Sequence, residues 1–168
     1  PGASALATAA RALREAQRPV IVTADLGRHV GGPEALVRLS QVAGVGVIEH
    51  GKRNFFNFPS EHPHHLGFDP RADIEAADLV IAVECPVPWI PAQSQRARAP
   101  RVIGVGVDPL FADLPMRGFP CDLSLAGDPA ATLRALADAI GGPASIRPEL
   151  AALHDQRFAA ARELARRD

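Results

Sequence analysis

Short runs of apolar residues recur along the chain, and each is bounded by polar or turn-forming residues. The runs cover residues 20–23, 45–48, 79–83, 102–107 and 123–125. Apolar residues at helical spacing mark four other segments, which are residues 4–17, 33–43, 69–77 and 128–140. Because the strand runs are continuous rather than alternating, both faces of each strand should be buried. Strands of this kind with helices between them predict a parallel sheet.

The pattern predicts an open doubly wound α/β domain, Rossmann-like, over residues 1–142. We expect about six parallel strands with helices on both faces, the sixth being a short edge strand at 64–67. Ser4 and Asp128 are expected to cap helices, and Pro33 to open one. Residues 143–168 predict a helical connector, which either packs on its own domain or leads toward a missing C-terminal cofactor domain.

Composition narrows the function classes. The chain has 168 residues, 47% of them hydrophobic, which is enough for a real core. Its 18 basic residues against 19 acidic ones argue against a nucleic-acid partner. No apolar run approaches the roughly 18 residues of a membrane span, so no membrane association is expected. Cys85 and Cys121 form no CxxC motif, which favours a reduced, cytoplasmic setting.

Ligands of open parallel sheets bind beyond the carboxyl ends of the strands, where the strand order reverses. The strand-end turns here are residues 24–28, 50–54, 84–89, 108–111 and 127–128. They yield a candidate cofactor-binding crevice formed by Asp25, Gly27, Glu84, Trp89 and Asp108. Helices are expected to start after Asp108 and Asp128, and a carboxylate cap at each would disfavour anion binding there.

The glycine and histidine motifs are weak. The G-x-G patterns at 44–46 and 104–106 lack the third glycine of a dinucleotide fingerprint and fall inside strand runs. His62, His64 and His65, near Asp69, have loose metal-ligand spacing and are interpreted as solvated or interface histidines. No metal site is therefore expected.

Three other features receive structural interpretations. Cys85 follows a buried strand and is interpreted as an inert thiol rather than a nucleophile with His50 as its base. Trp89 either plugs a gap in its own domain or serves a ligand or partner. Lys52-Arg53 is interpreted as a solvated pair.

The order of these segments resembles the central domain of thiamine-diphosphate-dependent enzymes of the acetolactate synthase type. The resemblance spans about residues 4–141. It rests on segments in the predicted strands and helices and at strand ends, which are residues 18–22, 35–39, 47–49, 77–81, 107–109 and 127–128. It also rests on a loop of the form GK…P…HP…LG at residues 51–67. It implies flanking thiamine-binding domains, a homo-oligomer, and thiamine diphosphate with Mg²⁺ acting on a 2-keto acid in the parent enzyme.

The same resemblance assigns no catalytic residue to this chain. The cofactor-activating glutamate belongs to the preceding domain of that family, and the Gly-Asp-Gly…Asn-Asn motif to the following one. Some relatives bind FAD or ADP on the central domain. In those FAD-binding relatives the turn after the first strand is usually of the type Gly-Ala-Gly, and here it reads Thr23-Ala24-Asp25. The loop after the third strand is usually Gly-Ala-Arg, and here it reads Glu84-Cys85-Pro86. FAD or ADP is therefore disfavoured, and the site is expected to be vestigial.

Two alternatives remain open. The chain could be a free-standing nucleotide-binding or regulatory module. It could also be a structural assembly domain whose contact is formed by Phe55, Phe56, Phe58 and Trp89.

Overall fold

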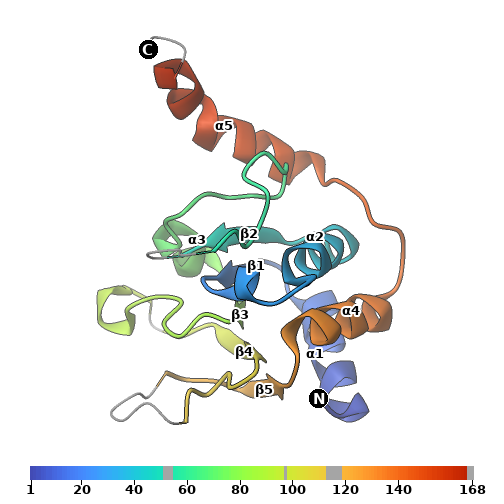
Figure 1. Cartoon of the computed structure of the whole chain (residues 1–168). Helices are drawn as coiled ribbons and strands as arrows, with labels where there is room; N and C mark the ends of the chain where they lie inside the picture. Colours follow the sequence, from blue (N-terminus) through green and yellow to red (C-terminus); the bar gives the residue numbers. More distant parts are fainter. Residues whose placement is uncertain (51–54, 97, 113–118, 166–168) are drawn as a thin grey trace.

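A five-stranded parallel sheet forms the centre of the computed structural model (Figure 1). The structure describes residues 1–50, 55–96, 98–112 and 119–165. The strand order is β2-β1-β3-β4-β5. The strands are β1 (Pro19–Thr23), β2 (Gly46–Glu49), β3 (Leu79–Val83), β4 (Arg101–Gly106) and β5 (Leu123–Ala126). The predicted α/β architecture is confirmed.

Helices cover both faces of the sheet. On one face lie α1 (Ala3–Glu15), α2 (Gly32–Ala43) and α4 (Pro129–Ile140). Ile21, Ile81 and Ile103 point to that face and pack with Leu36 and Leu133 in the larger core. On the opposite face lies α3 (Arg71–Ala76). The alternate strand positions, among them Val20, Val22 and Val80, pack there with Ile74. The continuous apolar runs therefore reflect burial on two sides.

The predicted sixth strand is reduced to a single bridge. Val47 pairs with His65 in parallel, and no strand is assigned at 64–67. Two backbone bonds form this bridge, one from the Val47 amide to the His64 carbonyl and one from the Leu66 amide to the Val47 carbonyl. The pairing ends at Gly67, which has a φ of 99° and donates its amide to the His65 ring. The described sheet thus has five strands rather than six.

The predicted helix starts have mixed outcomes. Asp128 caps α4 as expected, since its side chain accepts a hydrogen bond from the Ala131 amide. Ser4 does not cap α1: the helix starts at Ala3, its N-cap is Gly2 without a side-chain bond, and the Ser4 carbonyl accepts from Thr8. After Asp108 residues 108–112 form a turn rather than a helix, closed by a bond from the Phe111 amide to the Asp108 carbonyl.

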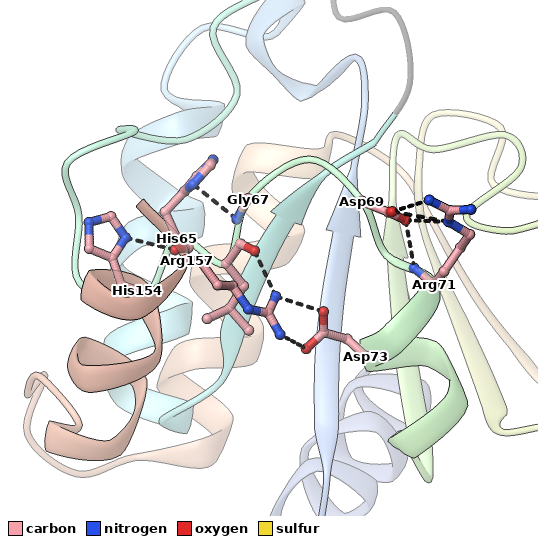
Figure 2. Close-up of polar contacts among 8 residues, drawn as sticks. His65, Gly67, Asp69, Arg71, Asp73, His154 and Arg157 are labelled. Atoms are coloured by element: carbon pink, nitrogen blue, oxygen red, sulfur yellow. Dashed lines mark hydrogen bonds and ion pairs between the residues drawn. The ribbon is translucent and has the colours of Figure 1, made fainter. Parts of the chain in front are cut away.

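The C-terminal tail contains α5 (Pro148–Ala165), whose first half packs on this domain beside β2. Leu150 and Leu153 pack against the smaller core cluster, which includes Ile74 of α3. Figure 2 shows His154 and Arg157 reaching from α5 toward the loop before α3 and toward α3 itself. That α5 leads toward a further domain stays a prediction.

No helix among the described residues is long and apolar enough to cross a membrane.

Candidate functional site

The strand order reverses between β1 and β3, and the turns that follow these two strands meet there. The Asp25 amide donates to the Glu84 carbonyl, at 3.1 Å, while the Glu84 amide donates to the Val105 carbonyl, at 2.9 Å. The structure therefore brings Asp25 and Glu84 together at the position where ligands of such sheets bind. Asp25 precedes a 3-10 turn, η1 (Leu26–Arg28), whose Arg28 lies on the Glu84 side of this switch point.

The side chain of Glu84 lies buried at this switch point. Its Oε1 accepts the Val107 amide, at 2.7 Å, and its Oε2 lies 3.3 Å from His29 Nε2 and 3.8 Å from Arg28 Nε. Gly106 lies beneath the carboxylate, where an added Cβ would be 2.5 Å from Oε1. Glu84 is only 7% exposed. A carboxyl group thus already occupies the switch point between β1 and β3.

Gly27 serves packing at this site. An added Cβ would lie 2.0 Å from the Phe56 carbonyl oxygen, so only glycine lets the loop approach so closely. Its amide donates to Asn57 Oδ1, at 2.9 Å. Gly27 therefore joins η1 to the loop that follows β2. A contact between Gly27 and a cofactor stays a prediction.

Trp89 forms part of a different hollow. It is buried and packs edge-on against Phe119, with ring centroids 4.6 Å apart. It also lines a cavity of about 830 Å³ together with His50, Phe68 and Ile90. Within its own domain, Trp89 thus both fills a gap and forms a pocket wall. Asp108 and Glu84 are not among the lining residues of this cavity.

His50 and Asp69 set the polarity of that cavity. Burial lowers the pKa of His50, although nearby Asp69 opposes the shift. His50 Nδ1 is buried and has no hydrogen-bond partner among the described residues. Hydrogen bonds from Arg71 lower the pKa of Asp69 to about 2, and Figure 2 shows this pair. The cavity therefore offers apolar walls, a neutral imidazole and an ion pair at its edge.

The interpretation of the loop histidines as solvated or interface residues is wrong for His64 and His65, whereas His62 is partly exposed. His64 and His65 are both 0% exposed. The Ser40 hydroxyl donates to the Val45 carbonyl and so accepts from His64 Nδ1, while His64 Nε2 accepts the Arg147 amide. These bonds assign a neutral imidazole, and burial, the largest cause, lowers the pKa of His64 to about 4.

Sequence reasoning missed a buried polar network at the end of β2. Glu49 is 1% exposed, and its two carboxylate oxygens accept from His65 Nε2, at 3.1 Å, and Asn57 Nδ2, at 3.0 Å. Asn57 in turn holds Gly27. The signal was an acidic residue that completes an apolar strand run. The network fixes the position of the long loop against the sheet.

The other sequence candidates are accounted for as follows. Cys85 and Cys121 are free cysteines, and Cys85 is buried. No group of three or more His, Cys, Asp or Glu in the described part of the chain could hold a metal ion. The four aromatic residues of the predicted assembly contact differ in exposure, since Phe58 and Trp89 are buried whereas Phe55 and Phe56 are exposed. Lys52 and Arg53 lie outside the described residues.

Comparison with known protein families shows to which family the chain belongs. The family described as "Thiamine pyrophosphate enzyme, central domain" matches residues 6–136. The chain belongs to this family. The matched range includes all five strands, the Glu49 network and the Glu84 crevice. No curated protein matches the chain.

A solved structure supports the fold of this central domain. It is an X-ray structure of a protein from Mycobacterium smegmatis, provisionally described as a thiamin diphosphate-dependent enzyme. The two chains share 24% identity with a TM-score of 0.68. The alignment covers 88% of the present chain and 30% of the other. The chain thus spans less than a third of that protein.

The crevice of this central domain does not fit a nucleotide diphosphate. A diphosphate placed at the switch point would meet the carboxylate of Glu84. That carboxylate already accepts the hydrogen bond of the Val107 amide. Two like charges brought together with little solvent repel strongly. The residues present at the switch point are therefore a poor electrostatic match for a diphosphate.

Proposed function

We propose that this central domain belongs to an acetolactate-synthase-like enzyme that uses thiamine diphosphate and Mg²⁺ to ligate or cleave 2-keto acids. The observation that carries the proposal is the family match over 6–136 together with the histidine-bearing loop, whose His64 and His65 are built into the fold. When bound, the cofactor supplies a carbanion that reacts with the keto carbon. We place the enzyme in the cytoplasm as a homo-oligomer.

Within that enzyme this chain acts as a scaffold. Its described polar groups are engaged in holding loops to the sheet, as with Glu49 and Asn57, rather than converging on an open reactive centre. The flanking thiamine-binding domains of the same polypeptide would carry the cofactor and the catalytic residues. The chain alone is therefore expected to be inactive.

The test is an assay of the full-length enzyme encoded by the gene. Pyruvate consumption should require added thiamine diphosphate and Mg²⁺, and should be absent when the present chain is assayed alone. Pyruvate or other 2-keto acids left untouched by the full-length enzyme in the presence of both cofactors would contradict the proposal.

We further propose that the nucleotide crevice is vestigial, because the Glu84 carboxylate lies buried at the switch point. Ligand binding to the folded state raises the unfolding temperature according to its concentration and Kd. Thermal-shift titrations with FAD, ADP and NAD⁺ should therefore leave the melting temperature unchanged. Saturable stabilisation by micromolar FAD or ADP would favour the free-standing nucleotide-binding module instead.

A second candidate function is assembly, and it is favoured by the exposure of Phe55 and Phe56. Their exposed fractions are 42% and 62%, unusual for adjacent phenylalanines on a surface that faces only water. Replacing both with serine should reduce the self-association of the full-length protein in light scattering. An unchanged oligomer size would exclude these residues as the contact.

A further inference from the structure

Residues 143–147, which lie between α4 and α5, are exposed and are attached to the end of α2 and to the histidine loop. The Ser145 amide donates to the Gln41 carbonyl, at 3.3 Å, and the Arg147 amide donates to His64 Nε2, at 2.9 Å. The side chain of Arg147 lies over Gly44, where an added Cβ would collide with the guanidinium. The attachment of this segment therefore depends on the ring of one buried histidine.

His62 and His64 each accept a backbone amide on one ring nitrogen. His64 Nε2 accepts from Arg147, and His62 Nδ1 accepts from the His64 amide itself, at 3.1 Å. His64 Nδ1 donates to Ser40, at 2.9 Å. His62 Nε2 lies 3.1 Å from the side-chain amide of Gln41. Because a ring nitrogen accepts only while it carries no proton, protonation of either ring sets two N–H groups against each other.

The surroundings of both rings disfavour a positive charge. Burial, the largest cause, lowers the pKa of His62 and His64, the latter to about 4. The two ring centroids are 5.1 Å apart, so a proton on one ring repels a proton on the other. The other titratable groups that face the pair come from the same loop, the segment before α5 and α5 itself, and they are His65, Arg147, Glu149 and His154. Among these groups, Glu149 favours a proton on His64 and the others oppose protonation of the pair.

We propose that His62 and His64 form a histidine latch, which holds residues 143–147 and the first turn of α5 to the domain while both rings are neutral and releases them when the rings take up protons. Release allows both rings to reach water, where the two positive charges are hydrated. Because the released state binds more protons than the latched state, acid shifts the equilibrium toward release. The latch acts on α5 whatever reaction the parent enzyme catalyses.

The other tethers of α5 do not require a neutral histidine. His154 Nδ1 donates to the His65 carbonyl, at 2.8 Å, and a protonated ring donates there equally. Arg157 binds Asp73 through charges that persist until the pH falls to about 4. His65 itself faces the Glu49 carboxylate, which compensates a positive charge on that ring. Between pH 7 and 4.5 the opening should therefore be confined to the segment before α5 and the start of that helix.

Hydrogen exchange of the full-length protein between pH 7 and 4.5, followed by mass spectrometry and corrected for the intrinsic effect of pH, tests the latch. Peptides that cover residues 143–153 report release, and peptides from α4 report opening of the domain as a whole. The fall of the His64 pKa from 6.5 to about 4 predicts an opening constant for 143–153 at least about tenfold larger at pH 4.5 than at pH 7. At each pH, residues 143–153 should open more readily than α4.

Histidine replacements identify the groups that respond. A double variant, His62→Gln with His64→Gln, takes up no proton at the latch, so the opening constant of 143–153 should lose most of its pH dependence. His50→Gln is the matched control, because burial also lowers the pKa of His50, which lines the cavity beside Trp89 instead. That variant should keep the wild-type pH dependence.

A measurement on the wild type covers a double variant that fails to fold. Exchange of the C2 hydrogens of the histidine rings reports the protonation of each ring, and His64 should protonate over the same pH range in which residues 143–153 open. An opening constant that does not change between pH 7 and 4.5, or that changes equally in the wild type and the double variant, overturns the latch. One common opening constant for 143–153 and α4 also overturns it, since only global unfolding would then occur.

Discussion

Gly106 lies under the carboxylate of Glu84, and the contact between them makes the first test at the residue scale. An alanine Cβ would be 2.5 Å from Oε1, so Gly106→Ala should displace the carboxylate from the Val107 amide. We expect a loss of about 1–3 kcal/mol in the free energy of unfolding. Urea unfolding measures it.

The same substitution has a built-in control. In a Glu84→Ala background Oε1 is absent, so Gly106→Ala should lower the free energy of unfolding clearly less than it does in the wild type. Equal costs in the two backgrounds would mean that the glycine is needed for a reason unrelated to Glu84.

His64 makes stability depend on pH. Its folded pKa of about 4 lies below the ordinary value of 6.5, so the unfolded chain binds more protons between these values. The stability contribution is therefore full above pH 6.5 and is lost as the pH falls toward 4, by up to about 3 kcal/mol. Urea unfolding across this window should show the fall.

A neutral replacement isolates this effect. In His64→Gln the side chain does not titrate, so the unfolding free energy should change less steeply between pH 6.5 and 4, although burial also lowers the pKa of His62 and His50. An identical slope in wild type and His64→Gln would contradict the assignment.

Residue-scale prediction from the sequence succeeded where the cause was local. Asp128 caps α4 because the residues directly after it begin a helix, so the cap depends only on residues adjacent in the sequence. The burial of His64 and His65 depends on α2, α5 and β2 meeting around their loop. Those contacts join residues far apart in the chain, so the polar loop composition suggested a solvated surface instead.

At the scale of elements, α5 depends on a small number of polar contacts. Arg157 donates to both carboxylate oxygens of Asp73, at 2.8 and 2.9 Å, and to the Leu66 carbonyl (Figure 2). Both side chains of the ion pair are largely shielded from solvent. Bidentate pairs of this kind are stronger than exposed ones.

We expect Arg157→Ala to lower the free energy of unfolding of α5 by about 1–3 kcal/mol. Hydrogen exchange of the first turns of α5 should accelerate, while exchange in α4 stays unchanged. Arg38→Ala is the matched control, since it removes an exposed ion pair with Asp138 that should contribute little. Unchanged exchange in α5 would contradict the tethering role of Arg157.

The element-scale predictions from the sequence held best for strands and long helices. The apolar run at residues 79–83 matches β3. A short continuous run of apolar residues between polar residues favours a buried strand. The prediction of a helix start after Asp108 was wrong, because an Asp-Pro pair favours a turn as readily as a helix start.

At the scale of the whole molecule, the family relationship and the fold agree, and we propose that the chemistry lies outside this chain. The sheet order, the switch-point crevice and the match over 6–136 place the chain as a central domain. The crevice could be located from the sequence because parallel sheets bind ligands at one edge. That the Glu84 carboxylate lies there required the structure, since its position depends on contacts from two separate turns, those after β1 and β4.

The coding sequence on both sides of this chain tests the central claim most directly. We expect an upstream domain that carries the cofactor-activating glutamate, and a downstream Gly-Asp-Gly followed by Asn-Asn. A start codon immediately before Pro1 and a stop codon soon after Asp168 would contradict it. The chain would then be a self-contained module, and its function would have to come from the Glu84 crevice and the cavity beside Trp89.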